Sequence, residues 1–168
     1  MNPDKIRERE EELVKIAFSE LNKIKGLHIL AGNIENRLGA ISFYVDNIHY
    51  NLIVKLLNDR FGIQVRGGCS CAGTYGHYLL HVTPSQSKHI TEKINHGDLS
   101  EKPGWVRMSL HPTMKNDELY FICDAIKKII ENISAWEKDY HYLSNKNEFV
   151  NLNMNGTIAE KVKEYFRV

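Results

Sequence analysis

This sequence of 168 residues has no long apolar run and almost no excess of charge of either sign. None of its apolar runs approaches the ~20 residues that cross a bilayer, so we expect no membrane-spanning helix. Lysine and arginine total 22 and aspartate and glutamate total 21, which gives a formal net charge of +1. This balance argues against a nucleic-acid-binding module that relies on bulk positive charge, and against a disordered charged tail.

Cysteine is also scarce. There are only three, and Cys69 and Cys71 are separated by a single residue, a number and spacing that do not make a disulfide framework. The first ten residues are highly charged and lack the apolar stretch of a secretory signal. These absences predict a reduced, cytoplasmic protein.

The apolar residues that are present fall into regular patterns. Spacings of three and four residues predict three amphipathic helices, over 6–24, 50–61 and 116–136. Gly26 and Gly62 are placed to end the first two helices, and Asn116 to cap the third. Alternation and short apolar runs predict four strands, over 27–31, 40–45, 63–66 and 105–110.

Three one-sided helices and a few short strands predict an α+β sandwich. We expect a small, largely antiparallel sheet of three or four strands with helices mainly on one face, and a hairpin between the first two strands. One domain would cover residues 1–138. Within it, the polar stretch 83–104 is expected to be an excursion with one short helix near 87–94. Residues 139–168 are expected to form a polar tail that can hold a helix over 157–166.

The most unusual segment is the glycine-rich stretch 66–77, Arg-Gly-Gly-Cys-Ser-Cys-Ala-Gly-Thr-Tyr-Gly-His. Glycines permit positive φ and let the backbone approach a ligand closely. A loop with thiols that directly follows a strand is a natural place for a site. An ordinary turn, with cysteines that act as small hydrophobic residues, is equally open.

Four chemical interpretations of this segment compete. A zinc half-site with His77 or His81 has the wrong spacing and no second cysteine pair, since Cys123 lies on the apolar stripe of the last helix. A disulfide between Cys69 and Cys71 would be strained. A phosphate-binding loop lacks the Gly-Lys-Ser/Thr that should follow. A reactive thiol makes use of Arg66, whose charge favours the thiolate.

A second segment, 104–113, places Arg107 in the middle of an alternating strand, on the face opposite Val106 and Met108. A guanidinium there needs a carboxylate or a phosphate, and its fork suits bidentate capture. An internal ion pair to Asp or Glu is the commoner alternative.

Together the two segments resemble a known family. The stretch 66–72 resembles the Arg-x-Gly-x-x-Cys-Ala segment of cysteine desulfurases and selenocysteine lyases, which are pyridoxal-phosphate enzymes of the class V aminotransferase group, fold type I. The stretch 106–113, with the acidic residues that follow it, resembles that group's Arg-x-Ser-x-x-x-Tyr-Asn-Thr segment. The stretch 37–43 resembles the strand that opens the small C-terminal domain.

The resemblance implies three roles. Cys71 matches the mobile-loop cysteine that attacks the substrate sulfur and becomes a persulfide. Arg107 matches the arginine that binds the substrate α-carboxylate, and Arg66 matches a second arginine at the substrate entrance. The family's Tyr-Asn is replaced here by His111-Pro112, and the linker between Gly73 and Gly104 is longer than the family's.

The resemblance also implies pyridoxal phosphate as the cofactor, a cysteine-like amino acid as the substrate and a homodimer as the assembly. No lysine here has the setting of the family's Schiff-base lysine, so we expect the large cofactor domain to be missing from this sequence. We therefore expect no cofactor bound to this part of the enzyme, no metal, and no nucleic-acid or membrane partner. The alternative is a free-standing interaction module whose Cys-x-Cys loop binds sulfur, a metal or a partner chain.

Overall fold

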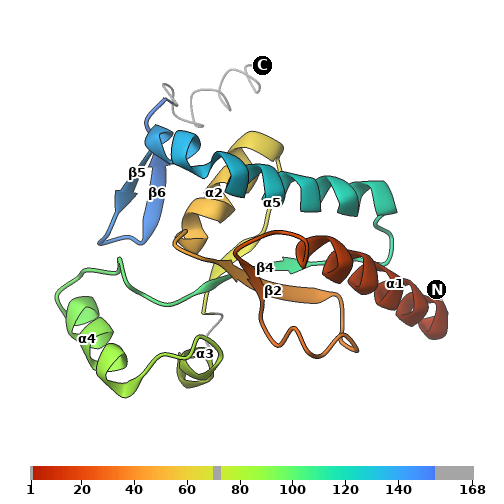
Figure 1. Cartoon of the computed structure of the whole chain (residues 1–168), viewed down its shortest axis with the longest axis horizontal. Coiled ribbons are helices and arrows are strands. Elements are labelled where there is room, and N and C mark those ends of the chain that lie inside the picture. Colours follow the sequence, from red (N-terminus) through yellow and green to blue (C-terminus); the bar gives the residue numbers. More distant parts are fainter. Residues whose placement is uncertain (1, 70–72, 154–168) are drawn as a thin grey trace, which may run out of the picture.

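The computed structural model describes residues 2–69 and 73–153 (Figure 1). Its helices are α1 (Pro3–Leu21), α2 (Tyr50–Phe61), α3 (Gly73–Leu79), α4 (Pro84–Asn95), α5 (Asn116–Trp136) and a short 3-10 turn (Glu137–Asp139). Its strands are β1 (Leu27–Ile29), β2 (Ala40–Val45), β3 (Arg66–Gly68), β4 (Trp105–Ser109), β5 (Tyr140–Leu143) and β6 (Glu148–Asn151).

The main sheet has four strands in the order β1-β2-β4-β3, and every neighbouring pair is antiparallel. The expected hairpin of the first two strands is confirmed, with Leu27 opposite Val45. The predicted α+β class with a small antiparallel sheet is confirmed as well. Strand β4 reaches the centre of the sheet from a distant part of the chain and pairs with both β2 and β3.

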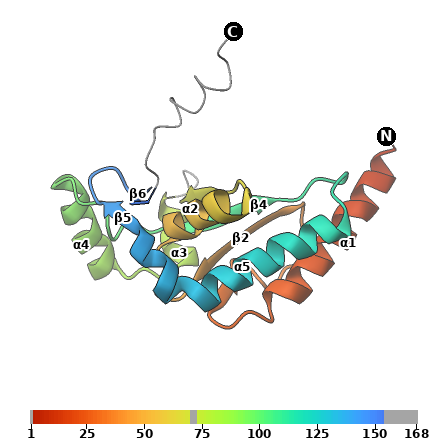
Figure 2. The same ribbon diagram turned by 90° about the horizontal axis from the view of Figure 1, so that it is seen from above.

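One face of the sheet is covered by helices. Ile41, Phe43, Val106 and Met108 are buried on that face, since alternate side chains of a strand point the same way. Figure 1 shows α2 and α5 on one side of β2 and β4, and α3 on the opposite side. Helix α1 packs along α5 (Figure 2). The core is therefore formed by one sheet face and three amphipathic helices.

The helix boundaries follow local chemistry. Helix α2 has its predicted limits and ends at Gly62, whose φ of 68° is the left-handed conformation that favours glycine. The first helix was expected to run to Gly26 but ends at Leu21, and Gly26, with φ 80°, belongs to the turn before β1. The expected cap Asn116 is instead the first residue of α5, and the Glu118 carboxylate accepts a hydrogen bond from the Lys115 backbone N–H.

The excursion is more ordered than its sequence pattern predicts. The expected short helix is α4, which is longer and begins with a capping box between Thr83 and Gln86. Helix α3 was not predicted, because its glycine-rich sequence has no apolar period. Strand β3 begins at Arg66, where the predicted strand 63–66 was expected to end.

The first part of the expected tail forms the hairpin β5–β6, which the sequence pattern did not predict. This hairpin rests on the start of α2. Asn51 Nδ2 donates to the Asn147 carbonyl at 2.6 Å, and Asn147 Nδ2 donates to the Tyr50 hydroxyl at 2.7 Å. The helix expected over 157–166 lies outside the described residues.

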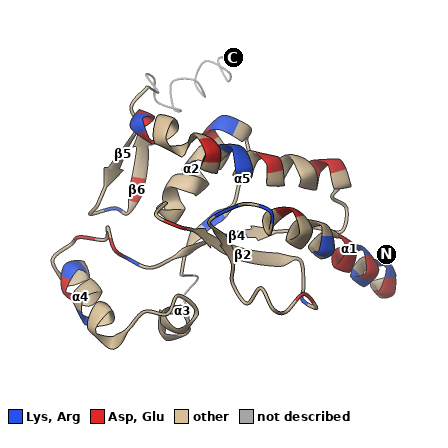
Figure 3. Cartoon of the chain, in the orientation of Figure 1, with Lys and Arg blue, Asp and Glu red and all other residues tan. Residues whose placement is uncertain are grey.

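Charges of both signs are interspersed on the same helices (Figure 3). None of the helices in the described residues is long and apolar enough to cross a membrane.

Candidate functional site

The sheet face away from the core carries the predicted arginines. Arg66 on β3 lies directly opposite Arg107 on β4, and Arg107 lies opposite Ser42 on β2. Residues opposite each other in an antiparallel pair share a face and have Cα atoms roughly 5 Å apart. The structure thus brings two predicted site residues from distant segments into one row.

Neither arginine is neutralised by a carboxylate of the residues that the structure describes. In the described part of the chain, no carboxylate forms an ion pair with Arg66 or Arg107. Arg107 is half-buried, and its Nε is buried without a hydrogen-bond partner among these residues. Like charges placed directly opposite each other destabilise a sheet, and an unpaired buried donor adds a desolvation cost. Both costs are relieved when an anion binds between the two guanidinium groups.

The loop that carries Cys69 and Cys71 follows β3 and so leaves the sheet next to the row formed by Arg66, Arg107 and Ser42, which we call the arginine row. Cys71 lies outside the described residues, but both described ends of its loop can be placed. Gly68 pairs with Trp105, two residues before Arg107 on the same strand. Across the gap, a Cβ built on Gly76 would lie 3.2 Å from the Trp105 ring and 3.9 Å from the Cβ of Cys69. The two ends of the loop therefore meet around Trp105, beside the arginine row.

Gly67 explains part of the glycine-rich sequence. A Cβ at this position would collide with the Asn51 amide oxygen and come within 3.1 Å of Val54. This glycine therefore lets β3 lie close to α2, a packing role that the sequence alone did not separate from ligand approach.

The third cysteine is a core residue, as predicted. Cys123 is buried on α5, and burial, with a smaller effect of the Glu20 charge, raises the pKa of its thiol to about 11. A thiol with so high a pKa is almost entirely protonated at neutral pH and is a poor nucleophile.

The described histidines do not form a metal site. His77 Nδ1 lies 3.3 Å from the Ser87 hydroxyl, and His81 is exposed with a φ of 53°. No group of three His, Cys, Asp or Glu side chains in residues 2–69 and 73–153 is arranged to hold a metal ion.

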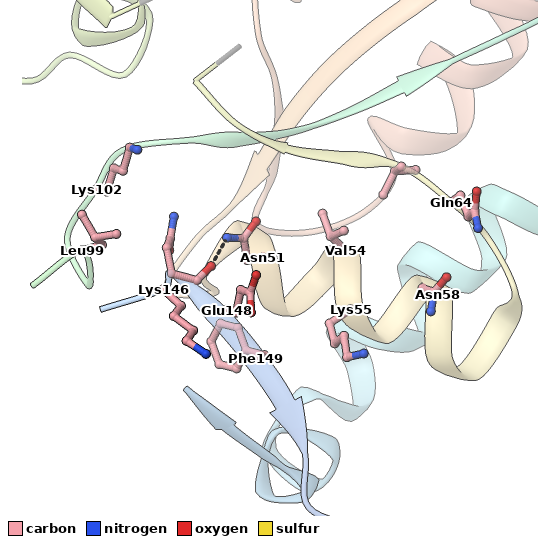
Figure 4. Close-up of a pocket in the computed structure, with 12 residues that line it drawn as sticks. Asn51, Val54, Lys55, Asn58, Gln64, Leu99, Lys102, Lys146, Glu148 and Phe149 are labelled. Atoms are coloured by element: carbon pink, nitrogen blue, oxygen red, sulfur yellow. Dashed lines mark hydrogen bonds between the residues drawn. The ribbon is translucent and has the colours of Figure 1, made fainter. Parts of the chain in front are cut away.

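A separate groove of about 720 Å³ lies between α2 and the β5–β6 turn (Figure 4). It is lined from four segments, and its charged residues are Lys55, Lys102, Lys146 and Glu148. Neither of the described site residues, Arg66 and Arg107, lines it. Sequence reasoning missed the groove because it missed the hairpin that forms one wall.

Comparisons with known proteins bear on the family and the fold of this chain. The model of the aminotransferase class-V family matches residues 1–121. The probable cysteine desulfurase 2 of Mycobacterium leprae (strain TN) is 38% identical over 68 residues, which are 40% of this chain and 16% of that protein.

Two solved structures share the fold. The cysteine desulfurase CsdA (S-sulfonic acid) of Escherichia coli has a TM-score of 0.50 at 16% identity, over 78% of this chain and 27% of that one. The apo cysteine desulfurase of Thermococcus onnurineus NA1 has a TM-score of 0.51 at 20% identity, over 77% of this chain and 27% of that one. The present chain thus spans about a quarter of these solved relatives. Since the family model matches well over half of its residues, the chain belongs to the aminotransferase class-V family.

Proposed function

We propose that this chain is the small-domain part of a pyridoxal-phosphate enzyme of the cysteine desulfurase or selenocysteine lyase type. In this proposal Arg107 binds the substrate α-carboxylate, Arg66 lines the substrate entrance and Cys71 takes up the substrate sulfur. The observation that carries the proposal is the cross-strand pair of arginines, which no carboxylate in residues 2–69 and 73–153 neutralises.

Arg107 suits a carboxylate anchor for two physical reasons. Its guanidinium offers parallel N–H donors that match both oxygens of a carboxylate. Its backbone lies in the middle of a sheet with β2 on one side and β3 on the other, so the anchor is held in a fixed position. A carboxylate held in this way fixes the orientation of the substrate α-carbon, which is how positioning accelerates a reaction.

Cys71 supplies the nucleophile. Its thiolate attacks the substrate sulfur, a new S–S bond forms, and the C–S bond of the substrate breaks with its electron pair left on carbon. The product on the protein is a persulfide, and the carbon is then protonated. The Arg66 and Arg107 charges favour the thiolate over the thiol.

The family is pyridoxal-phosphate dependent, and that cofactor, when bound, supplies the electron sink for the pair left on carbon. The open face fits an anionic group but not the covalent attachment of a cofactor. Its described strand residues are His28, Ala40, Ser42, Tyr44, Arg66, Gly68, Trp105, Arg107 and Ser109, and none is a lysine. We propose that the attachment lysine belongs to the part of the relatives that this chain does not span. Incubation with pyridoxal phosphate and borohydride should leave no lysine of this chain labelled above the level of free surface lysines.

The carboxylate role is tested by ligand titration. Propionate, added to the full chain and followed by NMR, should bind about 10-fold more weakly after Arg107→Gln, because a charge-assisted bidentate contact is lost. Arg7→Gln is the matched control, since Arg7 is exposed on α1 and pairs with Glu11 of the same helix. Equal affinity of the Arg107→Gln variant and the parent would refute the proposed anchor.

The thiol role is tested by alkylation. Iodoacetamide at neutral pH should label Cys71 faster than Cys69, as read by peptide mass spectrometry. Arg66→Gln should slow the labelling of Cys71 because it removes a charge that favours the thiolate. A Cys71 rate equal to that of Cys69 and insensitive to Arg66 would count against a catalytic thiol.

A further inference from the structure

A cavity of about 160 Å³ lies on the open side of the sheet, between the strand residue Trp105 and helices α3 and α4. Its apolar wall is made by Leu80, Ile90, Ile94, Pro103 and the Trp105 ring, and Cys69 and His77 also border it. This cavity takes no part in the proposed function.

The walls are mostly apolar and incompletely packed. Helix α4 has no fully buried residue. Ile90 and Ile94 line the cavity and remain partly exposed. Apolar cavities of about 150 Å³ stay dry and bind a molecule the size of benzene. The space beside Trp105 is therefore suited to a small apolar or aromatic group.

The cavity is positioned relative to the arginine row by the strand itself. Trp105 and Arg107 are two residues apart on β4, so their side chains leave the same face with Cα atoms about 7 Å apart. A molecule whose carboxylate is bound by Arg107 can extend an end group along β4 into the cavity. The side chain of free cysteine is too short to fill this distance.

We propose that this cavity is the side-chain pocket of the substrate site and that it selects an amino acid with a small apolar or aromatic end group, for example a cysteine whose sulfur is substituted. With such a substrate, the attack of Cys71 on the sulfur breaks the C–S bond, leaves the electron pair on carbon and forms a mixed disulfide on the protein in place of the persulfide. This inference rests on the carboxylate role of Arg107 in the proposed function. The long linker between Gly73 and Gly104 then has a purpose, because α3 and α4 supply most of the pocket wall.

Three probes on the full chain test the proposal: propionate, 3-phenylpropionate and neutral benzyl alcohol. The phenyl group should make 3-phenylpropionate bind about 10-fold or more tightly than propionate, which is the gain expected from burying one aromatic ring. Ile90→Trp fills the pocket and should reduce 3-phenylpropionate to the affinity of propionate without changing propionate itself. Val150→Trp, on the exposed face of the hairpin, is the matched control.

The outcomes separate the two proposals. If Arg107→Gln leaves propionate binding unchanged, the carboxylate anchor fails; benzyl alcohol binding that Ile90→Trp abolishes would then still support an apolar pocket. If 3-phenylpropionate binds no better than propionate, or Ile90→Trp leaves its affinity unchanged, the pocket is overturned even when the anchor holds. Ile94→Phe, a smaller change in the same wall, replaces Ile90→Trp if circular dichroism shows that the tryptophan variant is unfolded, and the same criterion applies to it.

Discussion

The two faces of the four-stranded sheet use the same strands for opposite purposes. On β4, Val106 and Met108 are buried against helices, whereas Arg107 between them points to the open side with no protein partner among the described residues. On β2, Phe43 is completely buried and its neighbour Tyr44 is only half-buried. The covered face supplies stability, and the open face keeps unsatisfied binding capacity at a cost in stability.

The largest effect should come from removing a side chain on the covered face. Phe43→Ala should lower the free energy of unfolding by about 3–5 kcal/mol, because it loses buried apolar area and leaves a cavity. Tyr44→Ala, one residue away on the open face, should cost much less. Urea unfolding of both variants measures the difference, and equal losses would mean that the open face is also a packed layer.

The next effect concerns the close approach of β3 to α2, which joins the two regions. Gly67→Ala should cost about 1–3 kcal/mol, since the added methyl group meets the Asn51 side chain and Val54 in a packed contact. Gly73→Ala is the control, because a Cβ there meets nothing within 4 Å. Thermal unfolding should show a lower midpoint for Gly67→Ala alone; identical midpoints would remove the packing role of this glycine.

A pH dependence should arise on the covered side at the hairpin. His49 stacks on Tyr50 at 4.5 Å between ring centroids, and the rings of Tyr142 and Phe149 also lie against it. Its Nδ1 accepts from the Asn51 N–H, and its Nε2 is buried without a partner among the described residues. Burial lowers the pKa of His49 below its usual value.

The direction of this pH dependence follows from the linkage between proton binding and folding. A histidine whose pKa is lowered by folding binds protons better when unfolded, so its stabilisation is present above about pH 6.5 and is lost as the pH falls through the folded pKa. The free energy of unfolding should therefore decrease on acidification, and less so in His49→Phe than in the parent. Urea titrations across this range measure both slopes, and parallel slopes would show that His49 does not titrate with folding.

Sequence patterns predicted the covered face well and the open face poorly. Helix α2 and strand β2 were predicted with their observed limits because their apolar periods are strong. Helix α3 has no such period, and its Gly76 occupies a position that close packing against the Trp105 ring decides. The β5–β6 hairpin was missed because its stability comes from contacts with α2, such as the Asn51–Asn147 hydrogen bond, rather than from local sequence.

In the candidate site, local sequence patterns predicted the face on which Arg107 lies but not the residue that lies opposite it. The alternation of 105–110 placed Arg107 on the face opposite Val106 and Met108, which the structure confirms. That Arg66 lies directly opposite it depends on strand register, which no local pattern encodes. The role of Cys71 stays a prediction, because this residue lies outside the described part of the chain.

The smallest expected effect on stability is also the sharpest test of the difference between the two faces of the sheet. Arg107→Gln removes one of two like charges that lie directly opposite each other and forfeits no ion pair within the described residues. The free energy of unfolding should therefore change by less than about 1 kcal/mol, and a small gain is expected. Arg60→Gln is the contrast, because Arg60 bonds to Asp139 at 2.5 Å and lies 4.4 Å above the Trp136 ring. A clear loss of stability in Arg107→Gln would show that this arginine stabilises the fold, and Arg107 would then not be free to bind a substrate carboxylate.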